Sequence, residues 1–333
     1  MSRPDPAASL TMTGDADAAE AVPNGAATAA TRPAHSQPAR GSVRLLTISF
    51  FIGLLAGILT LVPWLITGAR LPLQNLWGSE VLPAQMPLAL LPLSQYDAVA
   101  LVGLLTSGGA AAGLALRCWS PKRRGLTVLS AAAGLLLVQV TATAQAFLVV
   151  GNGLAPGPRS HLYLAGLLAG VGAAIVASVV ALLLLAARAR AVAALGMGIM
   201  AVPFVFWAES SVADLVGVHN VPLMVPVLWR WLPAVLVGAA LAWCGFRPMN
   251  RLLVWPLNLA FLWVTPAMFA AIGSSLGTRV YAGDLQAMSE QGAGVFAAAL
   301  APGRAVPAVL LALAIALAGS LLREVTARSG SKT

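Results

Sequence analysis

The residues best suited to binding a polar ligand lie inside one hydrophobic run. Gln139, Thr141, Thr143 and Gln145 alternate there with apolar residues. On a helix, Gln139 and Thr143 share one face because they are four residues apart, and Thr141 and Gln145 share a neighbouring face. Unsatisfied polar groups cost several kcal/mol in lipid, so these side chains must face other helices or a wet cavity.

Asn258, in a later hydrophobic run, is a plausible partner for this stripe. Two interpretations of Gln139, Thr143, Gln145 and Asn258 stay open. They tie neighbouring helices together by hydrogen bonds, or they line the path of a polar substrate through the membrane.

A second candidate set consists of charged residues beside aromatic residues at the outer ends of hydrophobic runs. They are Asp97 after Tyr96, Glu209 two residues after Trp207, and Arg230 between Trp229 and Trp231. Aromatic side chains anchor helices at the membrane interface, and adjacent charges usually reach the headgroups. These two acids and one arginine, at the outer ends of their helices, also have the charges with which a protein binds a small cation or anion.

Motifs of known enzyme classes are missing from the sequence. It contains no phosphate-binding loop with Lys-Ser/Thr, no G-x-S-x-G elbow, no H-E-x-x-H helix and no c-type haem motif. Cys118 and Cys244 have no further Cys or His at ligand spacing. We therefore predict no metal and no cofactor.

Catalysis without these motifs requires a nucleophile or two carboxylates held close together. The acids that could meet at the outer face are Glu80, Asp97, Glu209 and Asp214, although their spacing does not require it. An enzyme that acts on a lipid-linked substrate at the outer leaflet therefore stays an alternative.

The elements that position these residues are membrane helices. The chain has 333 residues, of which 59% are hydrophobic and 9% charged, whereas soluble domains have about 25% charged residues. A spanning helix needs about 20 mostly apolar residues. Eight segments qualify and predict an all-α integral membrane protein: Leu45–Ile66, Ala98–Leu116, Leu126–Val150, Leu162–Ala187, Ala191–Ala208, Leu228–Phe246, Leu252–Ile272 and Ala305–Leu322.

The basic residues predict the orientation of these spans. With a cytoplasmic N-terminus, the inner connections collect most of the positive charge, and the outer ones keep only Arg70, Arg159, Arg230, Arg279 and Arg304. This distribution obeys the positive-inside rule, so we predict a cell-membrane protein with both termini in the cytoplasm. The basic residues flank hydrophobic runs and form no separate polar face, so nucleic acid is not an expected partner.

Short matches at an offset of roughly 135–140 residues indicate an internal repeat. Val62-Pro63-Trp64 matches Val202-Pro203-Phe204, and Leu76-Trp77-Gly78 matches Leu215-Val216-Gly217. We predict two tandem parallel four-helix repeats, residues 43–190 and 191–323, related by an axis along the membrane normal. Residues 1–42 are expected to form a disordered cytoplasmic tail, and residues 324–333 a short one.

The repeat places Pro63 and Pro203 at equivalent depths. Proline lacks an N–H and tends to kink a helix, so the pair either shapes an outward cavity or ends spans near the interface. The sequence favours a permease-like protein that binds or moves a small or lipid-like solute, with membrane lipid and another membrane subunit or a separate ATPase as partners. A non-catalytic membrane scaffold or assembly partner is the first alternative.

Overall fold

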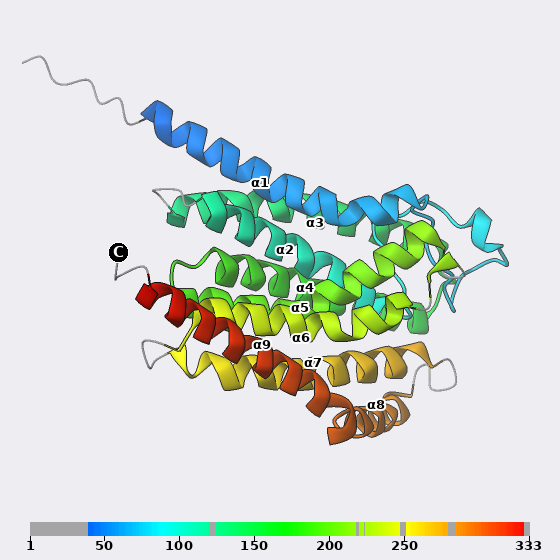
Figure 1. Ribbon diagram of the computed structural model, residues 1–333. Helices are drawn as coiled ribbons and strands as arrows, with labels where there is room; N and C mark the ends of the chain where they lie inside the picture. The colour runs from blue at the N-terminus through cyan, green and yellow to red at the C-terminus, as the bar shows by residue number, and fades with distance from the viewer. Residues whose placement is uncertain are drawn as a thin grey trace, which may run out of the picture. The chain divides into compact units, whose positions relative to one another are not determined.

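The fold is built from helices throughout the part of the chain that the structure describes (Figure 1). The computed structural model describes residues 39–119, 124–217, 220–222, 224–246, 251–278 and 284–329. The helices are α1 (Ala39–Ile66), a short 3-10 helix η1 (Pro83–Gln85), α2 (Ala98–Trp119), α3 (Arg124–Gly153), α4 (Pro158–Ala186), α5 (Arg190–Val216), α6 (Met224–Cys244), α7 (Val254–Gly277), α8 (Leu285–Ala299) and α9 (Pro302–Ser329). Residues 1–38 of the predicted tail lie outside the described residues, and residues 39–42 begin α1.

Eight of these helices are long and apolar enough to cross a membrane, namely α1 to α7 and α9. The predicted all-α fold with eight spanning helices is therefore confirmed. The fifth span was placed too short, because α5 continues from the predicted end at Ala208 to Val216. The helix α8 was not predicted from the sequence; it has 15 residues and is too short to span a bilayer.

Helices of the first predicted repeat pack through glycine residues. Gly109 and Gly113 of α2 lie against the backbone of α4, where a Cβ on Gly113 would come within 2.7 Å of the Leu182 carbonyl oxygen. On α3, Gly134 lies against the backbone of α1. Backbones approach this closely only where no side chain separates them, so these glycines fix the spacing of the helices.

Helices of the second predicted repeat pair in the same order. α6 packs against α9, and a Cβ on Gly238 would lie 2.8 Å from the Ala312 carbonyl oxygen. α5 packs against α7, where Gly198 lies beside the amide of Asn258. In each set of four spans, the first packs on the third and the second on the fourth. The tandem repeat stays a prediction, which these matched pairs favour.

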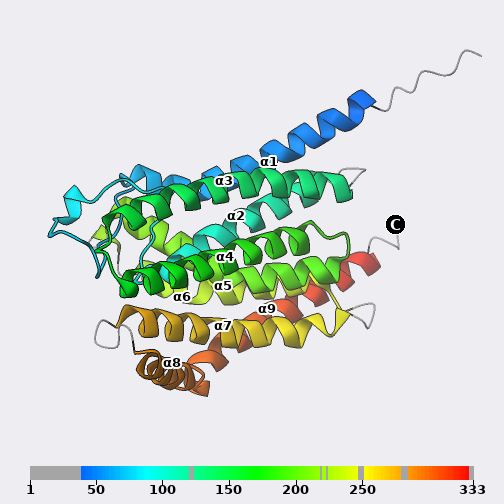
Figure 2. The same ribbon diagram turned by 180° about the vertical axis from the view of Figure 1, so that it is seen from behind.

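The two sets of helices meet where α5 packs against α2 and α4. Figures 1 and 2 show these three helices in the middle of the bundle, with α1 and α3 on one side and α7, α8 and α9 on the other. The helices approach closely at Gly103 of α2, where a Cβ would lie 2.8 Å from the carbonyl oxygen of Pro203. We call this contact between α2 and α5 the seam.

The connection between α1 and α2 is folded tightly onto the bundle. Leu71, Met86, Leu91 and Leu93 are almost fully buried in it, within one hydrophobic cluster that includes residues of α1 to α4. The indole of Trp64 donates to the Ala89 carbonyl oxygen at 2.9 Å. The connection therefore covers one end of the first four helices and holds its own polar residues in fixed positions.

Candidate functional site

Gln139 of α3 ties three helices together. Its side chain is 3% exposed, and its Nε2 donates to the Leu105 carbonyl oxygen at 2.8 Å and to the Ser178 Oγ at 2.9 Å. Leu105 lies on α2 and Ser178 on α4. The Thr143 hydroxyl donates to the backbone carbonyl of Gln139 at 2.7 Å, within the same helix. These bonds satisfy the donors of Gln139 inside the bundle, which favours a structural role.

Asn258 of α7 has a similar position in the other set of helices. It is fully buried, and its Nδ2 donates to the Ala194 carbonyl oxygen of α5 at 3.1 Å. Gln139 and Asn258 thus bond to different helices, and neither donates to the other.

Gln145 binds the folded connection between α1 and α2. The backbone N–H of Leu90 donates to its Oε1 at 2.8 Å, and its Nε2 donates to the Leu88 carbonyl oxygen at 3.0 Å. The side-chain amide therefore forms one accepting and one donating hydrogen bond with the backbone of the connection, as a neighbouring β-strand would. The spacing of the Gln/Thr stripe gave no sign of this role, because the partner is backbone rather than a side chain.

The rim acid Asp97 lies just before α2, at the outer end of the seam. Burial, and secondarily the charge of Asp214, raise the pKa of the Asp97 carboxyl to about 6. Asp214 lies near the end of α5, beyond the predicted end of that span at Ala208.

Hydroxyl and amide groups hold the backbone around Asp97. The Tyr163 hydroxyl donates to Gln74 Oε1 at 2.6 Å, and Gln74 Nε2 donates to the Leu93 carbonyl oxygen at 2.7 Å. The Tyr96 hydroxyl donates to Asn75 Oδ1 at 2.7 Å. The charge of Asp97 also acts on Tyr163. We name this set the outer polar cluster: Gln74, Asn75, Tyr96, Asp97, Tyr163 and Asp214.

The other two rim candidates have separate surroundings. Among the described residues, Asp214 and not Glu209 is the acid whose charge acts on Asp97. Glu209 is exposed, and the guanidinium of Arg230 lies over the Trp231 ring, 5.4 Å from its centroid. Arg230 therefore has the aromatic neighbour expected of an interfacial anchor.

The proline pair lies inside helices. α1 continues past Pro63 to Ile66, and α5 continues past Pro203 to Val216. Pro203 lies at the seam beside Gly103. Both prolines were identified from the sequence, whereas the contact of Pro203 with α2 depends on how the helices pack.

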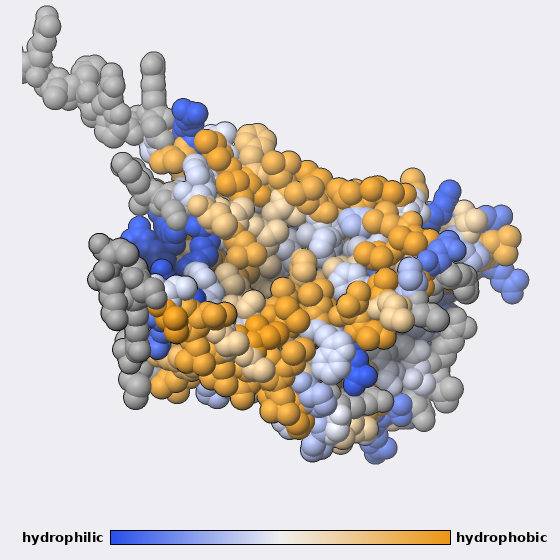
Figure 3. All heavy atoms as spheres, viewed as in Figure 1, coloured by the Kyte–Doolittle hydropathy of each residue, from blue (hydrophilic) through white to orange (hydrophobic). Residues whose placement is uncertain are grey.

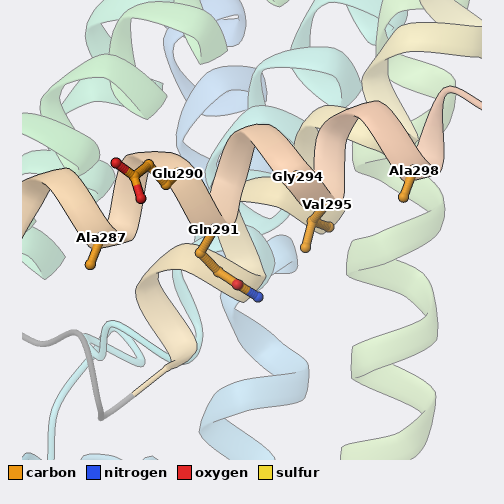
Figure 4. A pocket seen from close by; sticks show the side chains of 6 residues that line it. All are labelled: Ala287, Glu290, Gln291, Gly294, Val295 and Ala298. Atoms are coloured by element: carbon orange, nitrogen blue, oxygen red, sulfur yellow. The ribbon is translucent and has the colours of Figure 1, made fainter.

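A shallow groove of about 430 Å³ lies along α8. Figure 4 shows its lining residues, which all belong to that one helix: Ala287, Glu290, Gln291, Gly294, Val295 and Ala298. Gln286 donates to the Glu290 carboxylate at 3.0 Å, and Gln291 donates to Ser274 of α7 at 3.2 Å. Its two longest polar side chains are thus already bonded within the protein. Nowhere in the described part of the chain do three or more His, Cys, Asp or Glu side chains form a group that could hold a metal ion.

Comparison with known proteins finds no relative of this chain. The chain matches no protein-family model, no curated protein and no solved structure. The residues and contacts described above are therefore the basis for assigning a function.

Proposed function

We propose that the chain is a permease-like membrane protein that binds a small cationic solute at the outer polar cluster. The observation that carries this proposal is that Asp214, near the end of α5, lies close enough for its charge to act on the Asp97 carboxyl just before α2. Asp97 is half-buried and Asp214 is exposed. A half-buried carboxylate attracts a cation more strongly than it would in water, since the local dielectric constant is lower. A raised pKa also lets Asp97 exchange a proton near pH 6.

The seam is the contact at which movement would open or close this site. The Asp97–Asp214 pair takes one acid from the start of α2 and one from the end of α5. In transporters built from repeats, one repeat rocks against the other around a site at their interface. Because the two acids belong to different repeats, such rocking changes their separation and hence their affinity for a cation.

Matched helix pairs support the tandem repeat on which this mechanism depends. Gly109 of α2 meets Ser178 of α4, and Gly238 of α6 meets Ala312 of α9. The same helix of each repeat contributes the glycine, and the same helix contributes the carbonyl. The proposed units are residues 43–190 and 191–323.

The proposed location is the cell membrane, with both termini in the cytoplasm. Figure 3 shows mostly hydrophobic residues over the flank of the bundle and strongly hydrophilic residues gathered at its two ends. The described acids lie at the end with the outer polar cluster, except Glu324. Arginines at the opposite end favour the cytoplasm for that side.

Uptake by proteoliposomes tests the proposal, with methylammonium as the probe cation. Asp97→Asn and Asp214→Asn each remove a carboxylate and keep its size, so we expect uptake to fall at least tenfold. Glu290→Gln is the matched control, because it removes an exposed acid of α8 outside the cluster. Unchanged uptake in both aspartate variants would contradict the proposal. Conversion of a lipid-linked probe that requires both aspartates would instead favour the enzyme alternative.

An assembly role is the second candidate, and the exposed face of α4 favours it. Gly166 and Gly170 form a G-x-x-x-G motif, and a Cβ on either would meet nothing within 4 Å. Such motifs let another transmembrane helix approach closely. If the chain is a scaffold, Gly166→Val with Gly170→Val removes a co-purifying membrane partner and leaves the fold intact. Gly172→Val, also open, is the control.

A further inference from the structure

Arginines gather at the end of the bundle opposite the outer polar cluster. Arg117 and Arg124 both bond to the last residues of α4: Arg117 Nη1 donates to the Ala187 carbonyl oxygen, and Arg124 Nη1 to that of Ala186 at 3.2 Å. Because their acceptors are consecutive residues, these two guanidinium groups lie close together.

A second pair of arginines bonds to the end of α6. Arg251 Nη1 donates to the Cys244 carbonyl oxygen at 3.1 Å, and Arg323 Nη1 donates to the Ala242 carbonyl oxygen at 3.0 Å. The guanidinium of Arg117 lies over the Trp243 ring, 4.7 Å from its centroid. Since Trp243 lies between the two acceptors, Arg117 joins the pairs across the two sets of helices.

Arg190, at the start of α5, belongs to the same group. Its charge acts on Arg117, and it also acts on the Cys244 thiol together with Arg251 and Arg323. Arg190 is exposed, as is Arg323. We call these five residues the arginine patch: Arg117, Arg124, Arg190, Arg251 and Arg323.

The arginine patch carries more positive charge than its surroundings offset. Glu324 is the one acid that the described residues place at this end. The carbonyl groups at helix C-termini attract cations, but they carry only partial charge. Each guanidinium has five N–H donors in a planar fork, which suits the oxygens of a phosphate. The patch therefore has both the charge and the donors to bind a phosphate group.

Apolar side chains on the adjoining flank indicate where that phosphate comes from. Leu183 of α4, Leu253 just before α7 and Leu322 of α9 are 51%, 70% and 66% exposed. Along the chain, Leu322 adjoins Arg323, Leu253 follows Arg251 closely, and Leu183 lies one turn before Ala186. Acyl chains can cover these leucines while their headgroup reaches the arginines. A free phosphate ion would leave the leucines uncovered.

We infer that the arginine patch binds the phosphate headgroup of an anionic phospholipid, whose acyl chains lie along the exposed leucines beside it. Arg117 joins the two sets of helices through Trp243, so the bound lipid stabilises their contact. This inference does not depend on the proposed permease activity.

The test measures lipid affinity of the full chain in detergent micelles, with phosphatidylglycerol and phosphatidylcholine as probes and native mass spectrometry as the readout. We expect preferential retention of phosphatidylglycerol. The loss of one basic side chain near an anionic surface weakens lipid binding about fivefold. Arg124→Gln and Arg190→Gln should each show this loss, while Arg159→Gln, which removes an exposed arginine from the opposite end, should not.

Three results would overturn the inference. They are equal affinity for the two phospholipids, equal weakening by Arg159→Gln, and full phosphatidylglycerol affinity in the Arg124→Gln, Arg190→Gln double variant with native helix content. Inorganic phosphate alone forms the final arm. If it competes with phosphatidylglycerol at equal concentration, the ligand is a free phosphate ion and not a lipid; a much weaker effect supports the lipid.

Discussion

The indole N–H of Trp207 on α5 donates a hydrogen bond to the carbonyl oxygen of Thr60 on α1, at 3.1 Å. Thr60 lies one turn before Pro63, and Trp207 lies one turn after Pro203. The bond therefore joins the two proline-containing helices, close to the seam, across the boundary between the predicted repeats. Any movement of α5 relative to α1 has to break this hydrogen bond or move its donor and acceptor together.

Trp207→Phe keeps an aromatic ring and removes the N–H donor. We expect the free energy of unfolding in detergent to fall by about 0.5–1.5 kcal/mol, the usual net contribution of one hydrogen bond. Trp119→Phe is the control, since Trp119 is exposed at the end of α2. Equal stability of the two variants would show that the bond contributes nothing to the contact.

Gly103→Ala tests the close approach of α2 and α5. The added Cβ would lie 2.8 Å from the Pro203 carbonyl oxygen, so the helices must separate. We expect destabilisation by about 1–3 kcal/mol from overpacking, measured by thermal unfolding. Gly166→Ala meets open space on α4 and should be neutral or mildly stabilising. If Gly103→Ala is as stable as this control, the helices are not held as closely as described.

Gln139→Leu separates a structural role from a transport role. The variant loses the bonds to Leu105 and Ser178, and interhelical hydrogen bonds in membranes contribute about 0.6 kcal/mol on average. We expect a small loss of stability and methylammonium uptake within about twofold of the wild type. An uptake loss as large as that of Asp97→Asn would return Gln139 to the substrate path.

The pH dependence of stability tests the surroundings of Asp97. Because the folded protein raises the pKa of this carboxyl from 3.8 to about 6, the folded state binds its proton more tightly than the unfolded state. The resulting stabilisation is complete below the unfolded pKa and is lost as pH rises through about 6. Besides burial, the charge of Asp214 is the influence that raises the pKa of this carboxyl.

We therefore expect the unfolding temperature of the wild type to fall, relative to Asp97→Asn, between about pH 5 and pH 7. Circular dichroism during heating provides the measurement. A constant difference between the two proteins across this range would mean that Asp97 titrates as an exposed carboxyl does.

Hydrophobicity alone predicted the eight spanning helices, because a length of about 20 apolar residues has no other stable arrangement in this composition. It misplaced the end of α5, since the segment after Ala208 is polar on one face and continues as a helix at the boundary. Hydrophobicity also missed α8, because this short helix is only weakly apolar. Asp284 caps α8 by accepting hydrogen bonds from the N–H groups of Gln286 and Ala287.

The candidate site was less accessible to prediction because its partners are distant in sequence. Asp97 was identified by its place beside Tyr96, but Asp214 joins it only through the packing of α5 on α2. The Gln/Thr stripe was identified as needing partners, and for the Gln139 amide donors these are the Leu105 backbone carbonyl and the Ser178 hydroxyl. Backbone acceptors exist on every helix, so a sequence pattern cannot show which one a side chain reaches.

Methylammonium uptake at two pH values is the most direct test of a cation site at Asp97 and Asp214, with wild type, Asp97→Asn and Glu290→Gln in matched proteoliposomes. We expect uptake by the wild type and Glu290→Gln to rise between about pH 5 and pH 7, as the Asp97 carboxyl with its pKa of about 6 ionises. Asp97→Asn should show little uptake at either pH. Uptake that is equal in all three proteins at both pH values would contradict the cation site.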